Sequence, residues 1–248
     1  VPGGNRFSVL VRSRDGQRRI DDLVLPMPGR HNVQNALAAI AVAMELGVDD
    51  AGLRAGLARF GGVKRRFTKV GEVAGTTIID DYGHHPTEVR VTLETAQNYN
   101  PNGRVLAIFQ PHRFSRTAYF LSEFAKELSI ADKVFLLEVY AASETPIQGV
   151  TSLSIAQKMD PTKVIYEPSM PTVIEMVVEM ARPEDLIITL GAGDVWHGGF
   201  TLRLAEGASA HDAIIFANAV AALKCQGEGG RKATPSRNQV EEFLEERI

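Results

Sequence analysis

Short apolar runs alternate with amphipathic segments through the middle of the chain. The runs are bounded by polar or turn-forming residues and have the length of buried strands; they occupy residues 76–79, 105–109, 133–137, 164–166 and 186–190. Apolar side chains recur at helical spacing between them, over residues 86–97, 116–130, 151–159 and 171–182. Strands that alternate with helices in this way predict an α/β protein with a Rossmann-like, doubly wound, mostly parallel sheet.

The first 63 residues follow a different pattern. Residues 5–12 and 18–25 alternate apolar and polar side chains around an Arg-Asp-Gly-Gln turn at residues 14–17, which is typical of a hairpin of half-buried strands. Two helices are predicted after it, at residues 32–46 and 50–59. The second begins with acidic residues, which favour a helix N-terminus.

The strand pattern stops after residue 191. Helical spacing continues at residues 195–206, 210–224 and 236–247, with a glycine-rich link at residues 227–230. We therefore divide the chain into a first domain at residues 1–63, an α/β domain at residues 64–194 and a helical segment at residues 195–248.

Composition and charge narrow the range of partners. The net charge of −3 and the isoelectric point near 6.1 give no general attraction to nucleic acid or to an acidic membrane surface. We therefore expect no nucleic acid as a partner. No apolar run approaches the roughly 20 residues that span a bilayer, so we expect no membrane either. The single cysteine, Cys225, excludes an internal disulfide and a cysteine-built metal site, which fits a reducing compartment, the cytoplasm.

A group of ionisable residues, Asp-Asp-Tyr-Gly-His-His-Pro, follows a predicted strand at residues 80–86. The carboxyl end of a strand is where open α/β sheets bind ligands, and so many ionisable side chains in one turn favour a functional site. The alternative is a polar turn that caps the next helix. A metal site is the weaker interpretation, because the adjacent His84 and His85 cannot easily face one ion.

The turn after the next strand is cationic, with the sequence Gln-Pro-His-Arg-Phe-Ser-Arg-Thr at residues 110–117. Arg113 and Arg116 in this turn are able to clamp a carboxylate through paired hydrogen bonds. A solvated loop whose arginines cap nearby carbonyls is the alternative.

Two further motifs lie in the first third of the chain. Residues 28–35, Pro-Gly-Arg-His-Asn-Val-Gln-Asn, open the alanine-rich helix, and their asparagine amides suit the edge of an adenine. Asn32 is also a good N-cap, and it is possible to explain it by that role alone. Residues 64–67, Lys-Arg-Arg-Phe, are either a phosphate-seeking cluster or an exposed basic linker.

Together these motifs resemble the C-terminal part of the alanine-adding branch of the Mur ligase family, the UDP-N-acetylmuramate:L-alanine ligases. The resemblance covers about residues 1–196 and rests, in order, on PGRHNVQNALAAIAVA, KRRF, IIDDYGHHPTEV, FQPHRFSRT, LLEVYAASETPIQG and ITLGAGDVW. It implies ATP-dependent amide-bond formation in peptidoglycan precursor synthesis, with ATP, UDP-N-acetylmuramate and L-alanine as small-molecule substrates and magnesium as a cofactor. In that reaction the muramoyl carboxylate becomes an acyl phosphate, which the amine of L-alanine attacks.

The same resemblance implies roles for individual positions. Those that match the nucleotide site are His31, Asn32, Asn35, Arg66 and Asp81. Those that match the site for the amino acid are Tyr82, His84, His112, Arg113 and Arg116. Asp81 and His84 are the catalytic candidates.

The chain departs from the ligase pattern in one respect. It contains no Gly-Lys dipeptide and therefore no G-x-x-x-x-G-K-[ST] loop, which cradles the ATP phosphates in that family. We expect a fragment that is inactive alone, with the phosphate loop, the carbamoylated lysine and the magnesium ligands of the family lying upstream.

A second resemblance begins near residue 191. Residues 191–248 resemble the C-terminus of a ribokinase-like sugar kinase of the phosphofructokinase B type. In such kinases the Gly-Ala-Gly-Asp motif, here residues 191–194, forms an anion hole, and Asp194 would be the catalytic base. A carbohydrate kinase and a non-catalytic nucleotide-binding module are therefore the alternatives to a ligase fragment.

Overall fold

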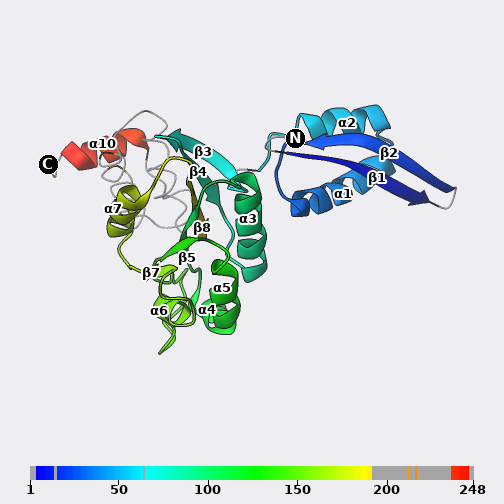
Figure 1. The fold of residues 1–248 in the computed structure, drawn as a ribbon. Helices are drawn as coiled ribbons and strands as arrows, with labels where there is room; N and C mark the ends of the chain where they lie inside the picture. The colour runs from blue at the N-terminus through cyan, green and yellow to red at the C-terminus, as the bar shows by residue number, and fades with distance from the viewer. Residues whose placement is uncertain are drawn as a thin grey trace.

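The computed structural model describes residues 4–13, 16–63, 65–191, 212, 216 and 236–245. Figure 1 shows a small hairpin-and-helix unit at the N-terminus beside a larger unit built on a twisted sheet. The helices expected at residues 195–206 and 210–224, and Asp194 itself, lie outside the described residues except for positions 212 and 216.

The N-terminal unit is the expected hairpin followed by two helices. Strands β1 (Asn5–Ser13) and β2 (Gly16–Leu25) pair antiparallel, and one face of the pair packs against α1 (Arg30–Glu45) and α2 (Asp50–Ala58). Its core consists of buried apolar side chains from β2 and both helices: Ile20, Leu23, Ile40 and Leu53. Alternation of apolar and polar residues therefore predicts this unit correctly.

The start of α1 differs from the prediction. Its N-cap is Gly29, at φ 90°, so Asn32 lies within the first turn and donates its side-chain N–H to the Pro28 carbonyl at 2.7 Å. The interpretation of Asn32 as the N-cap is therefore wrong. A Cβ at position 29 would lie 2.6 Å from the His31 ring and 2.7 Å from the Thr95 hydroxyl, so these contacts and the positive φ both favour glycine where the two units meet.

The larger unit contains a six-stranded sheet with the strand order β3-β4-β8-β5-β6-β7. All neighbouring strands are parallel except β3 and β4, which confirms the mostly parallel α/β fold. The strands are β3 (Thr68–Val73), β4 (Thr76–Asp81), β5 (Val105–Gln110), β6 (Lys133–Leu136), β7 (Val164–Tyr166) and β8 (Leu186–Gly191). Sequence patterning misses β3, because an edge strand with few buried side chains has no continuous apolar run.

Helices cover both faces of this sheet, as a doubly wound fold requires. One face packs on α3 (Pro86–Tyr99), α5 (Leu121–Leu128) and α6 (Ser152–Ala156) around Phe109 and Phe124, and the other on α7 (Met170–Met180) around Ile108 and Phe135. Successive β5 residues, Ile108 and Phe109, thus point to opposite layers.

The single helix predicted at residues 116–130 is wrong. Two helices, α4 (Phe114–Tyr119) and α5, meet at Phe120, whose backbone leaves the helical region at φ −109° and ψ 24°. The Phe120 ring packs edge-on against His85 at 4.6 Å and near Phe124 at 6.5 Å. Aromatic packing therefore holds the break that helical periodicity does not reveal.

At the C-terminal end the structure describes α10 (Arg237–Glu245), within the helix predicted at residues 236–247. Its buried Val240 packs with Phe216. Among the described residues, no helix has the length and apolarity needed to cross a membrane.

Candidate functional site

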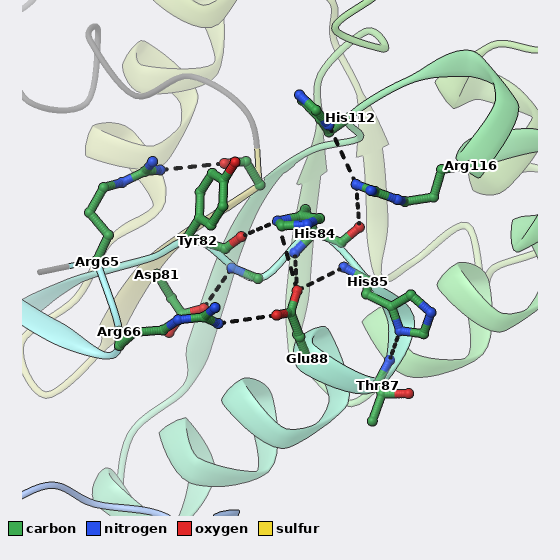
Figure 2. A network of polar contacts seen from close by, with 12 residues as sticks. Arg65, Arg66, Asp81, Tyr82, His84, His85, Thr87, Glu88, His112 and Arg116 are labelled. Atoms are coloured by element: carbon green, nitrogen blue, oxygen red, sulfur yellow. Dashed lines mark hydrogen bonds and ion pairs between the residues drawn. The ribbon is translucent and has the colours of Figure 1, made fainter. Parts of the chain in front are cut away.

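Strands β4 and β5 flank β8 in the parallel sheet, so the turns that follow them lie at the same sheet edge. Figure 2 shows that these turns bring together Tyr82, His84, His112 and Arg116. The Tyr82 and His84 rings lie 4.6 Å apart, and the His84 and His112 rings 5.8 Å. Four of the five residues predicted for the amino-acid site therefore form one cluster, called here the sheet-edge cluster.

Hydrogen bonds fix the tautomers of the two histidines in this cluster. His84 Nδ1 lies 2.9 Å from the Tyr82 carbonyl oxygen, which only accepts, so Nδ1 carries the hydrogen and Nε2 has the lone pair in the neutral ring. Arg116 only donates, and its Nη1 lies 3.4 Å from His112 Nδ1, so that nitrogen is the acceptor. The neighbouring imidazoles therefore present opposite nitrogens as acceptors.

Arg116 also donates to the His84 carbonyl at 3.5 Å and so connects the two turns. Arg113 is held differently. Its N–H donates to the Tyr140 carbonyl at 2.8 Å, and its half-exposed guanidinium lies 3.9 Å from the Glu144 carboxylate. The structure thus places both predicted arginines on one turn but gives them different partners.

Asp81 is a buried carboxylate with both oxygens bonded to backbone. One oxygen accepts the Phe67 N–H at 2.8 Å and the other accepts the Gly83 N–H at 2.7 Å. Burial raises the pKa of Asp81, against the opposing effect of these backbone hydrogen bonds. Its observable role is to hold the turn before β3 against the turn after β4; the catalytic role implied by the ligase resemblance stays a prediction.

Glu88 joins several predicted residues, although the sequence did not single it out. Its Oε2 accepts the backbone N–H groups of His84 and His85 at 3.1 and 3.2 Å, and its Oε1 accepts from Arg66 Nη1 at 3.2 Å. Burial alone would raise the pKa of Glu88, but the His84 amide, the His84 ring and Arg66 together lower it. The spacing from His85 to Glu88 is that of a capping box, which is the signal that could have identified it.

His85 occupies the N-cap of α3, so the helix-cap interpretation is right for this residue. Because His84 faces Tyr82 and His112 while His85 packs on Phe120, the two adjacent imidazoles do not face one ion. Within the part of the chain that the structure describes, no group of three or more His, Cys, Asp or Glu side chains is arranged to hold a metal ion.

A cavity of about 770 Å³ lies between the N-terminal unit and the start of α3. Apolar side chains of α1 and α2 make most of its wall, and Arg66, Asp81 and Glu88 line it from the sheet unit. The residues predicted for the nucleotide site all line this cavity: His31, Asn32, Asn35, Arg66 and Asp81.

The polar groups of α1 differ in how they meet the cavity. Asn32 is buried and bonded to Pro28, whereas Asn35 is exposed one turn further along. His31 Nδ1 is buried without a hydrogen-bond partner, and burial, followed by the charge of Arg66, lowers the pKa of His31. A buried ring nitrogen without a partner, in a wall made mostly of apolar side chains, suits a ligand that brings the complementary hydrogen-bonding group.

Arg65 is a further residue that sequence reasoning did not assign. Its Nε donates to the buried Asp80 carboxylate at 3.2 Å, and its guanidinium lies 4.7 Å above the Tyr82 ring (Figure 2). Arg65 therefore packs on one face of the Tyr82 ring and holds the ring in place. The basic cluster at residues 64–67 pointed to this segment but not to this contact.

Comparison with known families gives two matches. The model of the Mur ligase glutamate ligase domain matches residues 65–193, more than half of the chain. The model of pfkB family carbohydrate kinases matches residues 172–237, and the two matches overlap over residues 172–193.

Individual relatives extend the first match into the N-terminal unit. The UDP-N-acetylmuramate–L-alanine ligase of Novosphingobium aromaticivorans is 47% identical over 216 residues, covering 83% of this chain and 45% of the relative. The ligase of the same description from Rhizorhabdus wittichii is 46% identical over 218 residues, covering 83% and 46%. The chain therefore spans about half the length of the curated relatives it matches.

Solved structures agree with this likeness. The UDP-N-acetylmuramate-alanine ligase of Thermotoga maritima superposes with a TM-score of 0.61 at 29% identity, over 81% of this chain and 44% of that one. A murein peptide ligase from Psychrobacter arcticus gives a TM-score of 0.58 at 25% identity, over 88% and 42%.

Proposed function

Because the chain belongs to the Mur ligase family, we propose that its described residues hold the adenine end of ATP and the amino acid in an enzyme that joins L-alanine to UDP-N-acetylmuramate. One observation carries the proposal: Glu88 is hydrogen-bonded both to Arg66 in the cavity wall and to the His84 backbone in the sheet-edge cluster. The two predicted sites are thus neighbours joined through a single carboxylate.

The cavity suits an adenine. Its volume of about 770 Å³ lies within the usual range of small-molecule sites, and its apolar α1 and α2 walls can pack against a flat base. The exposed Asn35 amide offers a donor and an acceptor. With its hydrogen on Nε2, the neutral His31 ring offers the unpartnered Nδ1 as an acceptor for the adenine amino group.

The sheet-edge cluster suits an amino acid. Arg116 in the cluster and Arg113, which precedes it on the same turn, supply cationic donors for the carboxylate, and His84 Nε2 supplies a base for the amine. In the proposed step the amine nitrogen bonds to the carbonyl carbon of the acyl phosphate, the carbon–oxygen bond to phosphate breaks, and phosphate leaves. His84 Nε2 takes the proton that the amine loses, since Nδ1 is committed to Tyr82.

Magnesium, when bound, would neutralise charge on the transferred phosphoryl group. Among the residues that the structure describes, Asp81 and Glu88 alone contribute carboxylates to the cavity wall, and both are already hydrogen-bonded, so we assign no magnesium ligand to them. The single cysteine and the substrates fit a cytoplasmic location for this activity.

The carbohydrate-kinase alternative is supported by the family match at residues 172–237. That match begins after strand β7 and therefore includes none of the strands β3 to β7. Most of α7 and all of β8 fall in that match, yet β8 pairs with β4 and β5 at the centre of the ligase-like sheet. We therefore favour the ligase function for this region. A non-catalytic nucleotide-binding module is the remaining alternative, and binding of L-alanine distinguishes it.

Binding of nucleotides to the 248-residue chain tests the adenine site. A fluorescent ATP analogue should bind and be displaced by ATP, but roughly tenfold less well by ITP, whose base lacks the amino group. His31→Ala should remove this preference, whereas Arg90→Ala, an exposed arginine on α3, should leave it unchanged. Equal displacement by ATP and ITP would contradict an adenine-reading cavity.

Turnover gives a second test. With ATP, UDP-N-acetylmuramate and L-alanine all present, the 248 residues by themselves should release no phosphate, because the phosphate loop is not among them. Phosphate release that needs all three substrates would show that a complete ligase site is present.

A further inference from the structure

Glu144 lies on the loop between β6 and α6, and its carboxylate reaches the turn that carries both arginines. Its Oε2 accepts the Ser115 backbone N–H at 2.9 Å, and its Oε1 accepts the Ser115 hydroxyl at 2.6 Å. The hydroxyl first and the amide second lower the pKa of Glu144, so the side chain is charged at neutral pH. Both carboxylate oxygens are therefore engaged by the first turn of α4.

Helix α4 needs such a partner. It has only six residues, and its N-cap Arg113, at φ 76° and ψ 135°, makes no side-chain capping bond. The first N–H groups of a helix have no partner within the helix, and a negative charge near them is stabilising. Glu144 thus caps α4 from a loop 29 residues further along the chain.

The loop is built to aim Glu144 at this turn. Ala142 and Ser143 precede it with φ values of 48° and 72°, a left-handed conformation that is unfavourable for two successive residues with a Cβ. Tyr140 ties the same loop to the arginine turn, because its N–H donates to the Pro111 carbonyl at 2.8 Å and its carbonyl accepts from Arg113. The strained backbone of Ala142 and Ser143 thus lies where the chain turns back toward α4.

We infer that Glu144 is the positioning residue of the amino-acid carboxylate clamp, an inference that rests on the function proposed above. By capping α4 it fixes the turn on which Arg113 and Arg116 stand. It also holds the Arg113 guanidinium by a loose ion pair of 3.9 Å, from which the half-exposed arginine can turn toward a substrate carboxylate. Glu144 itself acts through these residues and does not touch the amino acid.

Four variants of the 248-residue chain test this role: Glu144→Ala, Glu144→Gln, Ser115→Ala and the control Glu94→Ala. Glu94 is an exposed glutamate on α3 that pairs with Arg90 at 3.7 Å, so it matches Glu144 in type and in its ion pair. Hydrogen exchange is measured over residues 115–120, and L-alanine is titrated by NMR.

Glu144→Ala should speed exchange at residues 115–120 and weaken L-alanine binding, each by roughly tenfold, since a lost cap frees the turn. Glu144→Gln should restore most of both, because its amide oxygen still accepts from Ser115. Ser115→Ala should have an exchange rate and an L-alanine affinity between those of Glu144→Ala and the unaltered chain, since it keeps the backbone hydrogen bond to Glu144. Glu94→Ala should match the unaltered chain in both measurements.

Unchanged exchange in Glu144→Ala would overturn the inference, as would faster exchange with unchanged L-alanine affinity, since the cap would then not serve the site. If the unaltered chain binds no L-alanine although exchange responds to Glu144→Ala, the fault lies with the proposed function and not with the cap.

Discussion

Arg66 Nη1 donates a hydrogen bond to Glu88 Oε1 at 3.2 Å, and this pair lies where the cavity meets the sheet-edge cluster. Glu88 belongs to the first turn of α3, and its other carboxylate oxygen accepts the His84 and His85 N–H groups. The Glu88 side chain therefore links Arg66 to the turn that carries His84 by hydrogen bonds. In the proposed ligase this pair would relate the position of the nucleotide to that of the amino acid.

Glu88→Ala should lower the free energy of unfolding by about 1–2 kcal/mol at pH 7, because it removes a capping box and leaves two N–H groups without their acceptor. Glu88→Gln should cost less, since the amide oxygen retains one acceptor. Urea unfolding with Glu94→Ala as the control measures both. A loss no larger than that of the control would show that water replaces the cap.

The Glu88 contribution should depend on pH. Because the folded-state pKa of Glu88 lies below its ordinary value of 4.5, the stability it provides is present above that value and is lost as the pH falls through the folded pKa. The gap between the unaltered chain and Glu88→Ala should therefore shrink in acid below about pH 4.5. A gap that stays constant from pH 7 to acid would mean that the ionised form is not the stabilising one.

Sequence patterning predicts most of the sheet because its strands are buried runs such as residues 105–109. It fails at β3, which pairs only at the sheet edge, and at Phe120, where aromatic packing breaks a helix. Both misses arise from tertiary contacts that leave no periodic signal in the chain.

The candidate site shows the same division. His31 and Asn35 lie on one helix and Asp81 lies far from them in sequence, and only the family resemblance grouped the three before the structure showed them around one cavity. Glu144 and Glu88 were not found, because each acts as an acceptor for backbone N–H groups. The capping-box spacing at the start of α3 was an available signal for Glu88, whereas Glu144 acts across 29 residues and leaves no local pattern. Residue type and spacing identify candidate binding and catalytic residues better than they identify the residues that position them by hydrogen bonds.

Arg104→Ala should destabilise the sheet unit by about 3 kcal/mol, because it leaves a buried carboxylate without its cation. The Arg104 guanidinium contacts both Asp185 oxygens at 3.0 and 2.6 Å, and the Asp185 side chain is only 3% exposed. Arg90→Ala, which breaks an exposed pair with Glu94, should change stability by less than about 0.5 kcal/mol. Equal thermal shifts for the two variants would contradict the burial argument.

Two glycine substitutions should act in opposite directions. A Cβ at Gly103 would lie 1.7 Å from the Glu184 carbonyl oxygen, so Gly103→Ala must displace backbone and should cost about 3 kcal/mol. Gly56 lies within α2 with nothing within 4 Å of an added Cβ, so Gly56→Ala should stabilise by about 0.5–1 kcal/mol. Calorimetry of both variants is the measurement, and a stabilising Gly103→Ala would refute the close approach.

The two arginines of the proposed clamp should differ in what their loss does. Arg113 is half exposed and only loosely paired, so Arg113→Ala should weaken L-alanine binding by about tenfold with almost no change in stability. Arg116 connects the two turns through His112 and the His84 carbonyl, so Arg116→Ala should weaken binding by at least as much and also lower the free energy of unfolding, by about 1 kcal/mol.

Lysine replacements separate charge from geometry in this turn. Lysine keeps the charge but lacks the planar pair of donors, so Arg113→Lys and Arg116→Lys should recover only part of the L-alanine affinity. Titration of L-alanine and of alaninamide, in which a neutral amide replaces the carboxylate, into each variant by NMR makes the measurement specific for the carboxylate. The variants should lose affinity for L-alanine but not for alaninamide, with Arg90→Ala as the control. Parallel losses for both ligands would mean that these arginines shape the turn without binding the carboxylate.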